Sequence, residues 1–231
     1  MLVVSNIDLT PNTRALKPTT FLDSTIKEPV LNINNDYRYL KTGYYVSLHA
    51  EVLGSKVIPS CENIIDSSRT PLLLLRAAKA GVPTLPNLVT DSVKRITARF
   101  GYPIVLFAVN PFIYEGYKTA NNKSALYRAM KSLGLSYKFA VCAQPLKGEM
   151  FTVKCLFGKA AKEDQQTQAI AQKVYETFQI PLCGLHMQKT KDNTYLCGLQ
   201  PIRKEELSEQ DLQTISKEVS LISEQGELFG V

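Results

Sequence analysis

The fold class is decided by the stretch Phe100-Gly101-Tyr102-Pro103-Ile104-Val105-Leu106-Phe107-Ala108-Val109. Gly101 and Pro103 end the helix that comes before them, and the apolar run 104–109 is typical of a buried strand. On the N-terminal side, Asp91 is placed to cap that short helix, and residues 88–90 form a short strand before it. A strand, a helix and a second strand within 25 residues predict a mixed α/β fold.

The same alternation continues outward in both directions. Toward the N-terminus, strands at 2–5, 29–34 and 56–60 surround a helix at 44–53, while residues 6–28 are mostly loop. This order of strands and helix predicts a small parallel sheet. The other expected elements are helices at 70–80, 124–133, 167–178 and from 208 onward, and strands at 116–120, 139–143, 150–157, 185–188 and 194–199.

Composition restricts the class of protein. The chain has 231 residues, of which 45% are hydrophobic and 21% charged, and this excludes disorder as the main state. No apolar stretch reaches the length of a membrane span, and Met1–Ser5 carries no secretion signal. Five cysteines at long spacings indicate reduced thiols in a cytoplasmic protein. Core packing is favoured over a metal site built around Cys183, His186 and Cys197.

The net charge is +6, with a pI near 9.0. The basic residues are scattered along the sequence, which favours a solvated surface of mixed charge over a nucleic-acid groove. We therefore expect neither a nucleic-acid nor a membrane partner.

A series of short motifs resembles the RimK-like carboxylate–amine ligases of the ATP-grasp superfamily. A further stretch, 34–51 with Gly43-Tyr44-Tyr45-Val46-Ser47-Leu48, is similar to the N-terminal domain that precedes some RimK-like proteins. The resemblance covers roughly residues 30–222. The ATP-grasp motifs are at 80–86, 100–105, 116–122, 141–149, 151–159, 180–187 and 195–201.

The resemblance implies an α/β fold with two parts. A small parallel-sheet N-terminal domain, residues 1–66, precedes a shortened ATP-grasp-like α+β module, residues 67–231, with a lid subdomain at about 88–140. ATP-grasp ligases phosphorylate a carboxylate, and an amine then attacks the acyl phosphate. This chemistry needs Mg²⁺ and lysines around the phosphates.

Several of the groups that the resemblance leads one to expect are replaced. Phe107 stands where the family has its lid-strand lysine, and Thr152 stands where it has an arginine. His186, Gly198 and Gln200 stand where the family has the Asp, Glu and Asn that hold magnesium. The glycine-rich phosphate loop is replaced by residues 110–116, and only residues 160–166 stand in for a longer acceptor segment. The chain is thus identified as a degenerate member.

Three functions remain open. The favoured one is a non-catalytic binding or regulatory relative of ATP-dependent carboxylate–amine ligases, with no cofactor. Phe112, Ile113 and Tyr114 would then contact a protein partner or a second copy, or would fill the emptied cleft. The alternative is an active or residual ATP-binding ligase with relocated residues, which would use ATP and Mg²⁺. The third is weak nucleotide or anion binding at the hinge, residues 141–146.

No catalytic or metal residue is predicted. The candidate cofactor-binding residues are Lys118, Gln144, Lys147, Glu149 and Lys154. The segment 37–45 either binds an acidic ligand through Arg38 and its tyrosines or is a loop that the fold requires, and the second is favoured.

Overall fold

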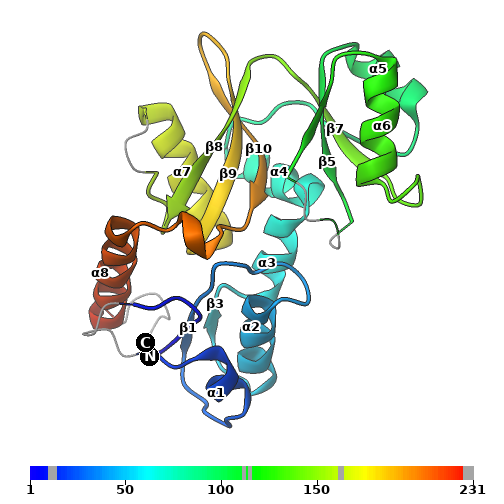
Figure 1. Ribbon diagram of the computed structural model, residues 1–231. Coiled ribbons are helices and arrows are strands. Elements are labelled where there is room, and N and C mark those ends of the chain that lie inside the picture. The colour runs from blue at the N-terminus through cyan, green and yellow to red at the C-terminus, as the bar shows by residue number, and fades with distance from the viewer. Residues whose placement is uncertain (10–14, 111–112, 114–115, 161–163, 226–231) are drawn as a thin grey trace.

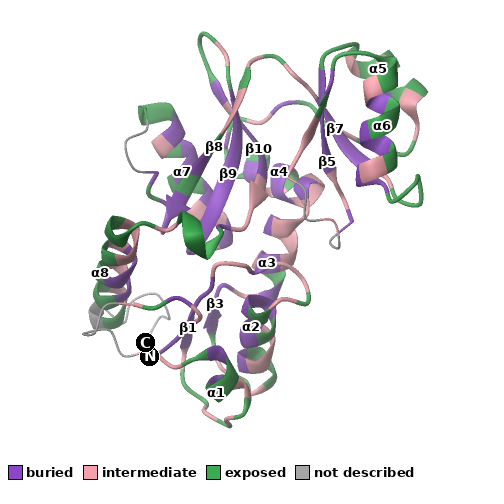
Figure 2. Ribbon diagram, in the orientation of Figure 1, coloured by how far each residue is buried: buried purple, intermediate pink, exposed green. Residues whose placement is uncertain are grey.

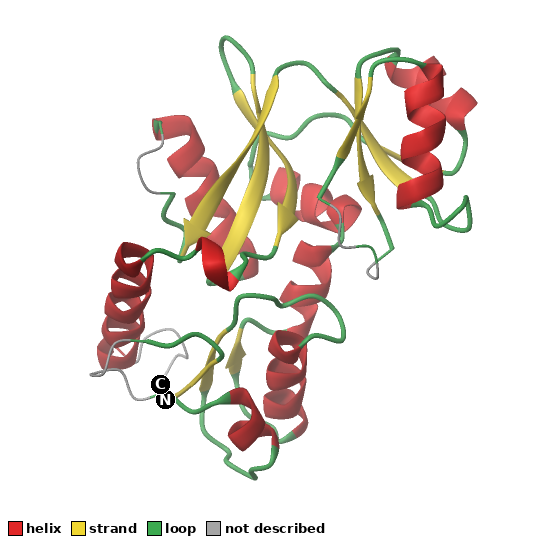
Figure 3. Cartoon of the chain, viewed as in Figure 1, coloured by secondary structure: helices red, strands yellow, loops and turns green. Residues whose placement is uncertain are grey.

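The structure is a computed structural model that describes residues 1–9, 15–110, 113, 116–160 and 164–225. Three β-sheets follow one another along the chain, each with its own helices (Figure 1). Figure 3 shows helices and strands mixed in every part of the molecule, as the sequence predicts for an α/β protein. The predicted fold class is therefore confirmed.

The N-terminal unit is the predicted parallel sheet. It joins β1 (Leu2–Ser5), β2 (Val30–Ile33) and β3 (Val57–Ile58) in that order. Helices α1 (Pro18–Leu22) and α2 (Thr42–Val52) cover it. Its small core consists of Val4, Phe21, Val30, Val46, Ala50 and Val57. The sequence pattern did not predict α1, which begins with a proline whose fixed φ suits a first helical turn.

The lid contains four strands in the order β4-β7-β5-β6. These are β4 (Leu88–Thr90), β5 (Ile104–Ala108), β6 (Lys118–Ala120) and β7 (Val141–Pro145), and all neighbours are antiparallel. Helices α5 (Val93–Phe100) and α6 (Lys123–Leu133) pack on one face. Because strand side chains alternate, Ile104 and Leu106 join the core under these helices, and Val105 and Phe107 join the main core.

The large sheet is an antiparallel meander in the order β10-β9-β8. Its strands are β8 (Glu149–Leu156), β9 (Leu182–Lys189) and β10 (Thr194–Gln200). Helix α7 (Gln165–Phe178) buries Ile170, Val174 and Phe178 in the same core as Val153 and Cys155 of β8. The opposite face of the sheet therefore carries Thr152 of β8 and its cross-strand neighbour His186 of β9.

Four further helical segments complete the fold. Helices α3 (Cys61–Ser68) and α4 (Thr70–Lys79) connect the N-terminal unit to the lid (Figure 1). The turn η1 (Lys204–Glu206) and helix α8 (Glu209–Gln225) follow β10. The sequence pattern did not predict α3, which Ser60 caps by accepting a hydrogen bond from the Asn63 backbone. The predicted domain boundary between residues 66 and 67 falls within α3 and stays a prediction.

The cysteines behave as core residues. All five are buried and carry free thiols, as the sequence predicts. Burial raises the pKa of Cys142 and Cys197 to about 12.

Buried residues are concentrated on the strands of the lid and the large sheet (Figure 2). No helix in the described part of the chain is long and apolar enough to cross a membrane.

Candidate functional site

An aromatic cluster occupies the space between the lid and the large sheet. The Phe107 ring of β5 lies 5.9 Å from the rings of Tyr117 and His186, measured between centroids. Tyr117 meets His186 edge-on at 5.1 Å. Phe107 is 2% exposed and His186 is 3% exposed. This part of the cleft is filled by the protein's own side chains.

His186 is held as a neutral imidazole. Its Nδ1 shares a hydrogen bond of 2.8 Å with Thr152 Oγ1, and its Nε2 finds no hydrogen-bond partner among the described residues. Burial lowers the pKa of His186 to about 4, because the charged ring would lose its hydration. The imidazole therefore acts as a packing group near neutral pH.

Two glycines make room for the cluster. A Cβ atom at Gly198 would lie 2.6 Å from Cε1 of Phe107, closer than any real contact. A Cβ atom at Gly116 would lie 3.0 Å from Nε2 of His186. Gly198 is paired with His186 across β9 and β10, so Phe107 rests on the sheet where a longer residue at 198 would stand. Phe107 therefore packs against His186 and over Gly198, and its ring fits there because residue 198 has no side chain.

The hinge end of the cleft is closed by two glutamines. Gln188 Nε2 donates to the Pro145 carbonyl at 3.1 Å, and its Oε1 accepts from the Lys147 backbone N–H at 2.8 Å. Gln144 Nε2 donates to the Cys197 carbonyl at 2.8 Å. Both side chains are fully buried. The main-chain donor and acceptor that the hinge offers at residues 145–147 are therefore already bonded within the protein.

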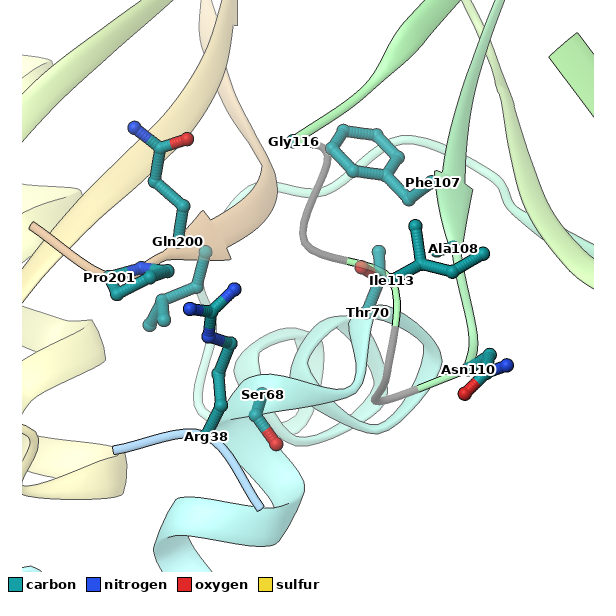
Figure 4. A pocket seen from close by; sticks show the side chains of 11 residues that line it. Arg38, Ser68, Thr70, Phe107, Ala108, Asn110, Ile113, Gly116, Gln200 and Pro201 are labelled. Atoms are coloured by element: carbon teal, nitrogen blue, oxygen red, sulfur yellow. The ribbon is translucent and has the colours of Figure 1, made fainter. Parts of the chain in front are cut away.

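A small cavity of about 50 Å³ remains at the other end of the cleft. Figure 4 shows Arg38 reaching into it from the N-terminal unit, opposite Phe107 and Ile113 of the lid. Arg38 also forms a two-pronged ion pair with Asp36. Ser68, Thr70, Asn110 and Gln200 supply the other polar lining groups. A volume of this size holds a few waters or a small anion, while drug-sized ligands occupy roughly 300–1,000 Å³.

The predicted cofactor-binding residues do not form one site. Lys118 bonds Ser132 at 2.9 Å and shares a face of the lid sheet with Leu106, turned toward α6. Lys154 lies on the outer part of the large sheet and pairs with Asp211. Lys147 and Glu149 are exposed near the hinge. Only Gln144 lies in the cleft, where it bonds β10. The five candidates are therefore not brought together in the structure, and a cofactor-binding role for each of them stays a prediction.

The structure describes part of the lid loop 112–114 and of the segment 37–45, for which the sequence left alternatives open. Of the lid-loop residues, Ile113 lines the cavity, and Phe112 and Tyr114 lie outside the described residues. Arg38 also lines the cavity, but Tyr37 is committed elsewhere: its hydroxyl accepts from the Asn34 N–H and donates to the Asn32 carbonyl. The favoured interpretation of this segment, a loop that the fold requires, agrees with the Tyr37 contacts.

Two residues of the cleft were missed by sequence reasoning. Gln188 follows His186 by two positions, so strand alternation places it on the same face, and this signal could have identified it. Tyr117 directly precedes Lys118, and the charge of the lysine made Lys118 rather than Tyr117 the candidate residue. The described residues hold no group of three or more His, Cys, Asp or Glu side chains that could bind a metal.

The chain matches one protein-family model in sequence, and it resembles several solved structures in fold. Residues 19–218 match the family model of the RimK-like ATPgrasp N-terminal domain. Comparison with curated proteins found no similar sequence. Among solved structures, the D-alanine–D-alanine ligase from Bacillus anthracis superposes with a TM-score of 0.66 at 12% identity, covering 98% of this chain and 100% of that one.

Two other solved structures share the fold. The RimK domain ATP-grasp protein from Sphaerobacter thermophilus DSM 20745 gives a TM-score of 0.61 at 13% identity, over 95% of this chain and 97% of that one. The D-alanine–D-alanine ligase from Helicobacter pylori gives 0.59 at 16% identity, over 84% and 70%. The fold is that of ATP-grasp ligases. Since the family model spans most of the sequence, the chain belongs to the family of RimK-like ATPgrasp N-terminal domains.

Proposed function

We propose that this protein is a non-catalytic member of the ATP-grasp fold, and that it acts as a binding or regulatory companion of a RimK-like ligase. One observation carries the proposal: Phe107, His186 and Gly198 fit together and fill the space between the lid and the large sheet. The matching family, named as the N-terminal domain of RimK-like ATPgrasp proteins, supports the companion role.

The electrostatics of the cleft support the same proposal. Mg²⁺ binds hard oxygen ligands, chiefly carboxylates. At the resembling positions this chain offers a neutral imidazole at His186, no side chain at Gly198 and a carboxamide at Gln200. This donor set does not fit magnesium. Without the metal and without a lysine at position 107, Arg38 is the one charged side chain among the described residues that line the cavity, and it is already paired with Asp36. The charge of a triphosphate would therefore be left largely uncompensated in the cleft.

The hinge provides a second, independent argument. An adenine edge binds through one N–H donor and one ring acceptor. The Gln188 carboxamide presents the same pair to the hinge, donating to Pro145 and accepting from Lys147. A nucleotide would have to displace a buried side chain that already satisfies both groups. We infer that adenine does not bind there in the manner of an ATP-dependent ligase.

Calorimetric titration of ATP, with and without Mg²⁺, tests the proposal. The expected result is no magnesium-dependent heat, and no ADP or phosphate formed when a carboxylate and an amine are supplied. Magnesium-dependent binding with ATP turnover that is lost in Gln200→Ala would overturn the proposal. That outcome would support the alternative, an active or residual ATP-binding ligase with relocated residues.

The companion role needs its own experiment. A RimK-like ligase encoded in the same genome is assayed for ATP turnover with and without this chain. A change in the ligase's kcat or KM at stoichiometric amounts of the chain is expected. Unchanged ligase kinetics, together with no association between the ligase and this chain in analytical ultracentrifugation, would contradict the companion role. The calorimetric titration with ATP tests separately whether the chain itself is inactive.

A further inference from the structure

The net charge of the protein resides in the lid. Residues 88–145 contain eight lysines and arginines against two acidic residues, Asp91 and Glu115, so the lid carries +6. The other 19 basic residues of the chain are balanced by 19 acidic residues. The whole excess of positive charge therefore belongs to one quarter of the chain.

Folding gathers these cations on the outer face of the lid. Seven of the eight are exposed, on α5, on α6 or in the loop that follows α6: Lys94, Arg95, Arg99, Lys123, Arg128, Lys131 and Lys138. Figure 1 shows both helices on the side of the lid sheet that is turned away from the large sheet. None of the seven takes part in an ion pair within the described part of the chain, whereas six other lysines pair with carboxylates or bond carbonyls elsewhere.

Aromatic side chains are exposed on the same face. Tyr127 and Tyr137 are each 44% exposed, and Phe139 is 45% exposed. The Tyr137 hydroxyl donates to the Tyr127 carbonyl at 3.0 Å, which holds the loop against α6. Lys123 and Lys131 lie one helical turn to either side of Tyr127. Cations and flat rings thus alternate along one stripe.

We propose that this outer face of the lid, defined by α5, α6 and residues 134–139, binds single-stranded nucleic acid. This face carries seven cations and no acidic residue, and the exposed Asp91 lies just before α5. Such a face suits a polymer of regularly spaced negative charges. Protein–protein interfaces are depleted in lysine, and four of the seven cations are lysines. Exposed tyrosine and phenylalanine rings supply stacking surfaces for unpaired bases.

This inference changes the expectation drawn from the linear sequence. The seven cations are spread over 45 positions, so they look scattered along the chain. The antiparallel lid places α5 beside α6 and brings them onto one face. The inference does not depend on the proposed function, because the face lies outside the cleft.

Fluorescence anisotropy with a labelled 12-nucleotide oligouridylate tests the proposal at 50 and 200 mM salt. The wild-type protein should bind, and its affinity should fall steeply with salt. The triple variant Lys94→Gln/Lys131→Gln/Lys138→Gln should bind at least about tenfold more weakly, with a salt slope reduced by about 2, since each phosphate contact on a single strand contributes about 0.7.

A matched control removes the same charge elsewhere. Lys79, Lys191 and Lys217 are exposed lysines outside the lid, and the triple change to glutamine at these sites should leave binding within about twofold. Tyr137→Ala/Phe139→Ala should weaken binding without altering the salt slope, because stacking releases no counterions. Circular dichroism verifies that this variant is folded.

Two results would overturn the proposal. Equal losses in the lid and control triple variants would mean that only overall charge attracts the oligonucleotide. Binding of polyglutamate but not oligouridylate, with the lid variant defective, would assign the face to an acidic protein.

Discussion

At the residue scale, the cleft is filled by substitutions that depend on each other. Phe107 needs the missing side chain at Gly198 in order to rest on the sheet, and His186 completes the ring cluster. A charged group at any one of the three positions would be buried against apolar rings. Each residue is unremarkable alone, but the three together define a packed interior between the lid and the large sheet.

The fit between Gly198 and Phe107 predicts a coupled pair. Gly198→Ala should destabilise the protein by about 1–3 kcal/mol, because the new Cβ overlaps the Phe107 ring. In a Phe107→Ala background the same change should be neutral or stabilising, since alanine restricts the unfolded chain. Denaturant unfolding of the four proteins in the cycle measures this coupling. If Gly198→Ala lowered the free energy of unfolding equally in the wild-type protein and in Phe107→Ala, the contact would be refuted.

The buried imidazole predicts a pH dependence of stability. The pKa of His186 falls to about 4 in the folded protein, against about 6.5 in the unfolded chain. Between these values only the unfolded state takes up the proton, so stability decreases as pH falls from about 6.5 to about 4. The loss amounts to about 3 kcal/mol once complete. His186→Gln should flatten this part of the profile in urea unfolding measured from pH 7 to 4. An unchanged profile would contradict this account.

At the element scale, the hinge between β7 and β8 is fixed by side chains from the large sheet. Gln188 on β9 bonds the backbone at Pro145 and Lys147, and Gln144 on β7 bonds the backbone of β10. The first two contacts join a side chain of the large sheet to the hinge backbone, and the third joins a lid side chain to the backbone of the large sheet. The lid is therefore attached to the large sheet by buried polar contacts in addition to its apolar face.

Removal of the Gln188 amide should weaken this attachment. Gln188→Ala leaves the part-buried Pro145 carbonyl and Lys147 N–H without their partner, which costs about 1–3 kcal/mol. Gln166→Ala is the matched control, because Gln166 bonds the backbone at Asp192 and Thr194 from an exposed position. Thermal unfolding and hydrogen exchange at the Lys147 amide report the two effects. A larger loss for Gln166→Ala would show that hinge burial is not the cause.

At the scale of the whole molecule, an ATP-grasp fold is combined with an unusual distribution of charge. The cleft is packed mainly with neutral groups, with Arg38 at one end, and the charge excess lies on the outer face of the lid.

Metal removal should leave the protein's stability unchanged. The described residues contain no cluster of three metal-binding side chains, and those of them that line the cavity include no carboxylate for Mg²⁺. Excess EDTA should therefore not shift the unfolding temperature, and Mg²⁺ with ATP should not raise it. Scanning fluorimetry gives the answer. A drop in Tm with EDTA that Mg²⁺ reverses would show that a metal is held.

The local pattern of the sequence determined much of this protein. The helix-to-strand switch around Gly101 and Pro103 and the parallel N-terminal sheet follow from apolar periodicity and turn residues, which act over a few neighbours. The family resemblance rests on short motifs in their order along the chain. Phe107, His186 and Gly198 are likewise read from the sequence, at positions where the resemblance leads one to expect a lysine and carboxylates.

Only the tertiary structure decided what those replacements do. Phe107 and Gly198 are 91 positions apart, and their contact exists because the lid folds over the large sheet. The direction of Lys118 toward α6 depends on strand register, which changes with a shift of one residue. The gathering of seven cations on one face depends on how α5 and α6 pack. Contacts between distant segments depend on packing and register across the whole fold, and local sequence preferences do not encode them.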